Sequence, residues 1–153
     1  MANTYTQIHL QLVFAVKFRS CLIQPSWKDE LYKYITGIIS SNEHKLLAIG
    51  GMPDHLHILI GMRPDQSVSQ LLKEVKGSSS KWINERKFLS RHFSWQEGFG
   101  AFSYSKSDLP KVISYIQHQE EHHRKKNFQE EYLDLLKEFQ VKFDERYILK
   151  NPT

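Results

Sequence analysis

The chain has 153 residues, of which 40% are hydrophobic and 25% charged, and its formal net charge is +4. This composition is typical of a globular protein and excludes an intrinsically disordered one, while the mild basicity permits nucleic-acid binding without requiring it. The longest apolar stretches are too short to cross a bilayer, and residues 1–5 show no secretory signal. Cys21 is the single cysteine, so an intramolecular disulfide is excluded and a reducing compartment is favoured. We therefore expect one cytoplasmic domain over residues 1–153.

The first half of the chain predicts a strand, a helix and two more strands. Residues 5–16 alternate apolar and polar side chains with a period of two, as a half-buried strand does. Residues 25–42 carry apolar side chains at helical spacing behind Pro25, a residue suited to a helix start. Two short apolar runs follow at residues 46–49 and 56–60, joined by a turn rich in glycine and proline.

The second half predicts three helices and one strand. Ser67 and Gln70 form a capping box ahead of an amphipathic helix. A short strand over residues 99–105 precedes a helix at about 108–126, and a last helix covers about 129–140. The resulting order, β-α-β-β-α-β-α-α, predicts an α+β fold with an antiparallel sheet and helices packed on one face.

Two histidines separated by one apolar residue lie in the strand after the turn. Side chains two apart on a strand point to the same face, so His55 and His57 project together while Leu56 faces the core. Two imidazole nitrogens on a rigid strand can form half of a metal site. Taken alone, such a pair more often binds nothing.

A tyrosine and a glutamine stand one turn apart on the helix at about 108–126. Tyr115 and Gln119 share one helix face, and a tyrosine can act as a covalent nucleophile while an amide oxygen is a hard metal ligand. With His55 and His57, Gln119 makes a set of three neutral ligands that leaves a divalent ion its full charge. The alternative is that Tyr115 is only a core aromatic.

Basic residues gather in two places that suit DNA phosphates. Three lysines flank a run of serines in the helix that follows Ser67, and a second basic cluster covers residues 124–126. The candidate DNA contacts are Lys73, Lys76, Ser79, Lys81 and Arg124. The same features also fit a nucleic-acid-binding module without chemistry, and that alternative stays open.

Five segments together resemble a known family. Residues 52–59 are similar to its proline-aspartate-histidine block, 73–82 to its basic helix and 95–103 to its tryptophan-glycine strand. Residues 115–123 resemble its tyrosine helix, and 128–132 the segment after it. In this order they resemble the single-tyrosine HUH transposases of the insertion-sequence 200/605 type, which move single-stranded DNA elements.

The resemblance implies an HUH domain with a defined chemistry. Tyr115 would attack a DNA phosphate to leave a 5′-phosphotyrosine link and a free 3′-hydroxyl. His55 and His57 would hold Mg²⁺ or Mn²⁺, with Gln119 as third ligand. No general base for Tyr115 is assigned.

The resemblance also implies partners. The substrate would be single-stranded DNA with hairpins at the element ends. The protein would work as a homodimer in which the tyrosine helix of one subunit completes the histidine pair of the other. A degenerate transposase that only binds DNA or RNA is the alternative.

Overall fold

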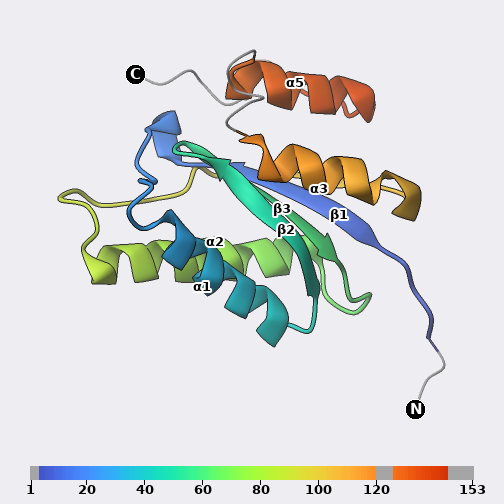
Figure 1. Cartoon of the computed structure of the whole chain (residues 1–153), viewed down its shortest axis with the longest axis horizontal. Coiled ribbons are helices and arrows are strands. Elements are labelled where there is room, and N and C mark those ends of the chain that lie inside the picture. The colour runs from blue at the N-terminus through green and yellow to red at the C-terminus, as the bar shows by residue number, and fades with distance from the viewer. Residues whose placement is uncertain (1–3, 120–125, 145–153) are drawn as a thin grey trace.

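The computed structural model describes residues 4–119 and 126–144, which form a sheet with helices on both sides (Figure 1). Two 3-10 turns, η1 and η2, join the longer elements. In chain order the elements are β1 (His9–Ala15), η1 (Lys17–Arg19), α1 (Lys28–Ser41), β2 (Lys45–Met52), β3 (His55–Gly61), α2 (Val68–Arg86), β4 (Gly100–Ser103), η2 (Lys106–Asp108), α3 (Leu109–Gln117) and α5 (Phe128–Glu138).

The sheet has the strand order β2-β3-β1-β4, and each neighbouring pair is antiparallel. This confirms the predicted α+β class. Strand β3 is central, and His57 on it lies between Val13 of β1 and Gly50 of β2. Because β3 is hydrogen-bonded on both sides, the two histidines are held on a rigid part of the backbone.

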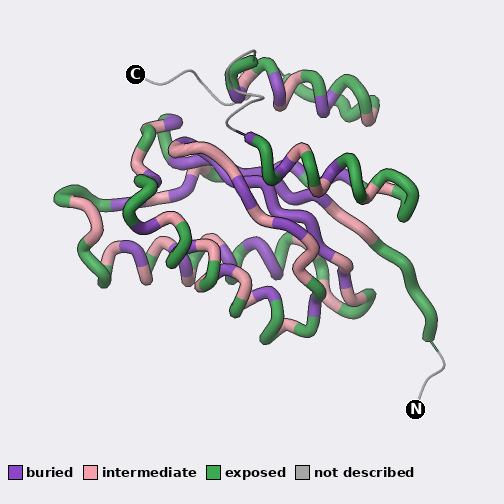
Figure 2. The backbone as a smooth tube through the Cα atoms, viewed as in Figure 1, coloured by how far each residue is buried: buried purple, intermediate pink, exposed green. Residues whose placement is uncertain are grey.

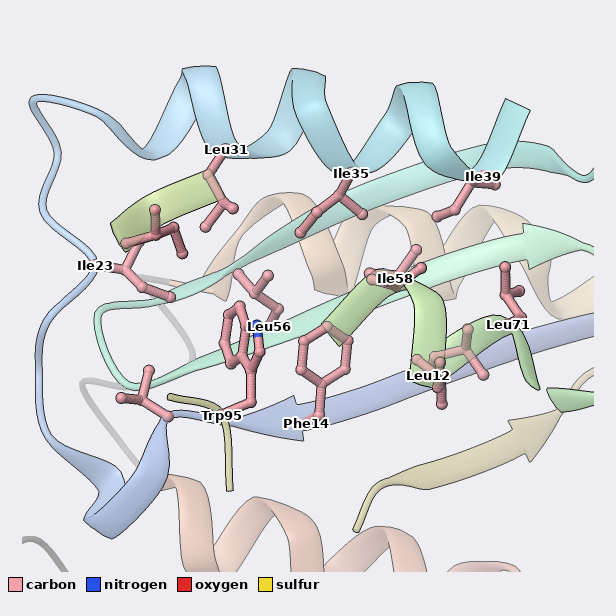
Figure 3. Close-up of a cluster of buried hydrophobic side chains, with 14 of the residues drawn as sticks. Leu12, Phe14, Ile23, Leu31, Ile35, Ile39, Leu56, Ile58, Leu71 and Trp95 are labelled. Atoms are coloured by element: carbon pink, nitrogen blue, oxygen red, sulfur yellow. The ribbon is translucent and has the colours of Figure 1, made fainter. Parts of the chain in front are cut away.

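Helices α1 and α2 cover one face of the sheet and build the larger core. Leu12 and Phe14 of β1 and Leu56 and Ile58 of β3 point to this face (Figure 3). There they meet apolar side chains of α1 and α2, among them Leu31, Ile35 and Leu71. The alternation in β1 and β3 thus directs one set of side chains into this core, as the sequence predicted.

Helices α3 and α5 cover the opposite face, so the expectation that all helices pack on one face was wrong. Figures 1 and 2 show the largely buried strands lying between the two pairs of helices. Val13 and Ala15 meet α5, and Leu59 meets α3. The second face carries histidines and a glutamine, and in the sequence these polar residues indicate a face exposed to solvent. Those polar side chains are instead buried beneath the two helices.

Most element boundaries agree with the sequence, with one difference that concerns the tyrosine helix. Ser67 caps α2 by accepting a hydrogen bond from the backbone N–H of Gln70 at 3.1 Å, as expected. The helix expected at about 108–126 instead ends at Gln117, because His118 leaves the helical conformation with φ −113° and ψ 36°. The rest of that expected helix, residues 120–125, lies outside the described residues.

Within the described ranges, every helix is too short or too polar to cross a membrane.

Gly50 allows α3 to approach the sheet closely. A Cβ at this position would lie 2.4 Å from the backbone oxygen of Ile116, the residue next to Tyr115. Glycine in a strand commonly marks such an approach of another backbone segment. The close packing of α3 on the sheet therefore requires a residue without a Cβ at position 50.

Replacing Gly50 with alanine is expected to lower the free energy of unfolding by about 1–3 kcal/mol, because the new methyl group overpacks the contact with α3. Urea unfolding measures this change. The matched control is Gly37→Ala in α1, where a Cβ meets open space and alanine is expected to be neutral or to stabilise by about 0.5–1 kcal/mol. A Gly50→Ala protein as stable as the wild type would contradict the assigned contact.

Candidate active site

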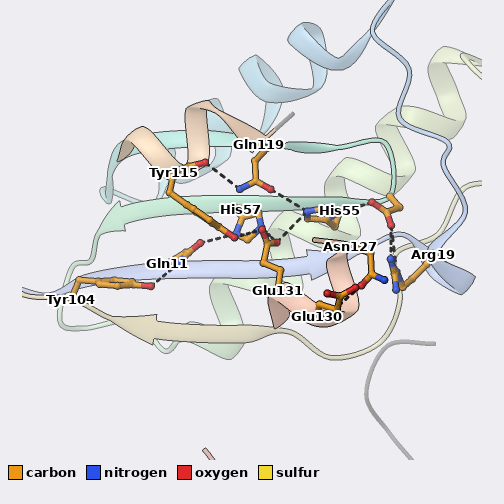
Figure 4. Close-up of polar contacts among 11 residues, drawn as sticks. Gln11, Arg19, His55, His57, Tyr104, Tyr115, Gln119, Asn127, Glu130 and Glu131 are labelled. Atoms are coloured by element: carbon orange, nitrogen blue, oxygen red, sulfur yellow. Dashed lines mark hydrogen bonds and ion pairs between the residues drawn. The ribbon is translucent and has the colours of Figure 1, made fainter. Parts of the chain in front are cut away.

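Strand β3 places His55 and His57 side by side beneath α3 and α5. Both are 0% exposed, and their ring centroids are 5.2 Å apart (Figure 4). Phe128 of α5 stacks on His55 with ring centroids 4.1 Å apart. The two rings thus share a face, as the alternation predicted, and they are buried inside the protein.

Each imidazole is oriented through its Nδ1 atom. His55 Nδ1 lies 2.7 Å from Oδ1 of Asp54, and His57 Nδ1 lies 2.6 Å from Oε1 of Gln11. Both partners offer an oxygen, so each Nδ1–H donates and each Nε2 is left as an acceptor. Such partners fix the ring orientation of metal-binding histidines.

Two further side chains hold these orienting groups. Arg19 pairs with Asp54 at 3.0 Å in the interior, and Gln11 donates from its Nε2 to the Tyr104 hydroxyl at 2.8 Å. Burial of the Asp54 carboxyl acts to raise its pKa, but its bonds to His55 and Arg19 outweigh burial and lower that pKa overall. Asp54 therefore stays ionised beside His55.

Glu131 of α5 reaches the two histidines from above. Its Oε1 lies 2.8 Å from Nε2 of His57 and 3.6 Å from Nε2 of His55, and the residue is buried. The ligand atoms of these three residues all lie within 4.8 Å of one another. A carboxylate that faces two acceptor nitrogens needs a proton or a cation between them, so this group could bind a metal ion.

The Tyr115 hydroxyl donates a hydrogen bond to Oε2, the second carboxylate oxygen of Glu131 (Figure 4). The ring also meets His57 edge-on with centroids 5.8 Å apart. Burial and the neighbouring carboxylate raise the pKa of the Tyr115 phenol well above its usual value. A single carboxylate thus contacts both the histidine pair and the tyrosine.

Gln119 also lies at the histidines. Its Oε1 is 3.4 Å from Nε2 of His55, while its Nε2 donates to the backbone oxygen of Tyr115 at 3.2 Å. The structure therefore brings together the four residues singled out in the sequence and adds Glu131. With that carboxylate the candidate ligand set carries a negative charge, whereas the sequence predicted neutral ligands only.

Sequence reasoning missed Glu131, Asp54 and Gln11 as parts of this cluster. Asp54 directly precedes the first histidine, and Gln11 lies on the polar face of the first strand. Glu131 stands three residues after Phe128 and four before Leu135, both buried, which puts a carboxylate on the buried stripe of α5. An acidic residue on the buried stripe of a helix could have indicated that Glu131 belongs to a functional site.

Comparison with known proteins decides the family. The family described as "Transposase IS200 like" matches residues 4–119, which include both histidines, Tyr115 and Gln119. The chain belongs to the IS200-like transposase family.

Two known transposases are similar to this chain in sequence. The ISDra2 transposase TnpA of Deinococcus radiodurans is 28% identical over 75 residues, which cover 49% of this chain and only 54% of that relative's length. The transposase for insertion sequence element IS200 of Salmonella typhimurium is 26% identical over 125 residues, covering 78% and 81% of the two chains.

Two solved structures share the fold of this IS200-like chain. A candidate transposase from Deinococcus radiodurans R1 matches with a TM-score of 0.64 and 22% identity, over 78% of this chain and 95% of that one. A REP-associated tyrosine transposase bound to a REP hairpin matches with a TM-score of 0.57 and 16% identity, over 76% and 68%. At these identities the likeness shows the fold.

Four of the residues expected to contact DNA lie on α2, on the other side of the sheet from the histidines: Lys73, Lys76, Ser79 and Lys81. Ser79 is fully buried and its hydroxyl accepts a hydrogen bond from Nε1 of Trp95 at 2.9 Å, so its expected contact with phosphate is wrong. Lys76 is half-buried and donates to the backbone oxygens of Gln96 and Gly98, so it holds the loop before β4.

The remaining candidates are not engaged in this way. Lys73 and Lys81 are exposed, and Lys81 lies 3.9 Å from Glu85 one turn along α2. Arg124 lies outside the described residues. The contacts of Lys73, Lys81 and Arg124 with DNA remain predictions.

Replacing Glu131 with glutamine is expected to weaken Mn²⁺ binding by at least about tenfold, because the one anionic ligand becomes a neutral amide. Titration calorimetry or the paramagnetic resonance signal of free Mn²⁺ measures the affinity. Glu130→Gln is the matched control, since Glu130 is the exposed neighbour on α5 and is expected to leave the affinity unchanged. Equal affinity in both variants would show that Glu131 does not bind the ion.

Proposed function

We propose that residues 1–153 form one HUH transposase domain that nicks and rejoins single-stranded DNA through a covalent bond to Tyr115. The observation that carries this proposal is the convergence of the Tyr115 hydroxyl, two histidine nitrogens and the Glu131 carboxylate in one buried cluster. A nucleophile beside a metal-binding group is the arrangement that phosphoryl transfer requires. Membership of a transposase family supports the choice of DNA as substrate.

The residues fit a divalent metal ion. His55, His57 and Glu131 would hold it, with Gln119 beside them, and the fixed Nδ1–H groups leave the Nε2 lone pairs directed at Glu131. The carboxylate and amide oxygens favour Mg²⁺ or Mn²⁺ among the common ions. When bound, the cation would neutralise charge on the scissile phosphate and favour the phenolate form of Tyr115.

Tyr115 would act as the nucleophile. Its Oη attacks the phosphorus, the bond from phosphorus to the 3′-oxygen breaks, and a 5′-phosphotyrosine forms. The phenol proton passes to Glu131, which already accepts it in a hydrogen bond, and the departing 3′-oxygen takes up a proton to become a hydroxyl. Attack by a 3′-hydroxyl reverses the step and rejoins DNA without another energy source.

The substrate we propose is single-stranded DNA that carries hairpins, at the ends of an insertion sequence in the cytoplasm of a bacterium. The structural neighbour bound to a REP hairpin supports this choice. The physical alternative is a protein that binds such strands without cutting them. The half-buried contact of Tyr115 with Glu131 favours catalysis, because a surface that only binds DNA has no need of a phenol held beside a carboxylate and two histidines.

We further propose that one chain supplies the whole site, even if two copies associate as a homodimer. Val112 and Ile116 of α3 pack on Ala48 and Leu59 of the same chain, and this packing brings Tyr115 to the chain's own histidines. The composite site implied by the family resemblance would instead need α3 from a partner.

The nucleophile is tested by incubating the protein with Mn²⁺ and labelled hairpin oligonucleotides taken from DNA that flanks its gene. A covalent adduct is expected for the wild type and none for Tyr115→Phe, because phenylalanine has no attacking oxygen. Tyr132→Phe is the matched control and should keep the adduct. If wild type binds these strands but forms no adduct, the binding-only alternative is favoured.

The single-chain site is tested by mixing Tyr115→Phe with His57→Ala, after each variant has been shown to fold by circular dichroism. A site built within one chain predicts that the mixture stays inactive, because each chain lacks one required group. In a site shared between two subunits, about half of the randomly paired dimers would be mixed and each would hold one intact site of two, so recovery of adduct towards about a quarter of the wild-type level would reveal such a site.

A further inference from the structure

A cleft of about 710 Å³ lies between α3 and α5 and ends at Tyr115 and Glu131. Its size is within the range of about 300–1,000 Å³ typical of small-ligand sites. We propose that it binds the nucleotide adjoining the scissile phosphate and prefers a base that carries an exocyclic amino group. This inference rests on the proposed function, since it assigns a neighbouring nucleotide to the same site.

The walls of the cleft are stripes of polar side chains on the two helices. On α3 and the turn before it, Asp108, Lys111 and Tyr115 are spaced three and four residues apart and so share one helix face. On α5, Glu131 and Glu138 are seven residues apart and line the same cavity. Because Glu131 is buried and Glu138 is exposed, the cleft extends along α5 from an inner part at Glu131 to an outer part at Glu138.

Lys111 is placed to bind the DNA backbone. It is exposed, and it precedes Tyr115 by one turn of α3, a rise of about 5–6 Å. A strand whose scissile phosphate lies at Tyr115 would bring an adjacent phosphate to this ammonium group. Backbone contacts of this kind position a strand without reading its sequence.

The outer part of the cleft suits a base. Tyr104 and Phe139 line it, with ring centroids 5.3 Å apart and planes at 82°, and aromatic rings are the usual stacking partners of unpaired bases. The Tyr104 hydroxyl accepts a hydrogen bond from Gln11, and burial, with the nearby charges of Glu138 and Asp108, raises the pKa of Tyr104 to about 12.

Glu138 is the side chain best placed to select the base. Asp134 is paired with Lys126, and Asp108 accepts a hydrogen bond from Ser105. The carboxylate of Glu138 forms no hydrogen bond or ion pair with any residue of ranges 4–119 and 126–144. A carboxylate accepts from the amino groups of adenine, cytosine or guanine, whereas thymine has no exocyclic amino group to donate.

The test is a titration of the full chain with dAMP, dCMP, dGMP or dTMP, each up to about 10 mM. Two-dimensional NMR spectra measure the binding. The aromatic signals of Tyr104 and Phe139 should shift, and dTMP should bind about tenfold more weakly than the other three, the loss of one hydrogen bond to a charged group. Glu138→Gln should bring the four affinities within about threefold, while its matched control Glu130→Gln should keep the difference. Lys111→Ala should weaken the binding of all four nucleotides equally. Its control Lys137→Ala changes a lysine of α5 outside the cleft and should leave the four affinities unchanged.

Equal binding of all four nucleotides by the wild type, or shifts confined to residues outside the cleft, would overturn this inference. The two proposals can fail separately. If a Tyr115 adduct forms but the nucleotides do not bind in the cleft, the cleft assignment fails and the nicking activity stands. If the nucleotides bind as expected but no adduct forms, the cleft stands as a base-selective nucleotide site, while the nicking activity and the link of the cleft to a scissile phosphate fail.

Discussion

The carboxylate of Glu131 contacts His57 with one oxygen and the Tyr115 hydroxyl with the other. These partners come from β3 and α3, and Glu131 comes from α5, so three elements meet at one side chain. An ionised carboxylate in the interior is costly unless it is paired. The cost is offset only while both neighbours keep their places, which couples the packing of α5 to the geometry of the site.

Two chains of hydrogen bonds keep the two histidines in place. Arg19 holds Asp54, which orients His55, and Tyr104 accepts from Gln11, which orients His57. Arg19 reaches inward from a turn in which its own φ is 53°, in the left-handed region. Such a conformation costs about 1–3 kcal/mol in a residue other than glycine, and strain of this kind is common around functional sites.

Part of the site could be predicted from the sequence because it depends on local periodicity. Alternation in a strand brings His55 and His57 to one face, and helical spacing brings Tyr115 within one turn of Gln119. The antiparallel α+β fold followed from the order of the same periodic segments.

The remainder depends on contacts between elements, which no local pattern contains. That α3 and α5 cover the second face follows from packing against Val13, Ala15 and Leu59. The contact of Glu131 with His57 spans 74 residues of sequence. Ser79 was misassigned because a serine among lysines resembles a phosphate contact, whereas its side chain faces the core and binds Trp95.

The central claim is that Glu131 joins the metal-binding histidines to the nucleophile within one chain. A crystal of the full chain grown with Mn²⁺, and measured for the anomalous scattering of manganese, tests it most directly. We expect one anomalous peak within about 2.0–2.3 Å of Nε2 of His55, Nε2 of His57 and a carboxylate oxygen of Glu131, with Tyr115 of the same chain beside it. A peak bound by the histidines while Glu131 points away, or with Tyr115 supplied by a second molecule, would contradict this account.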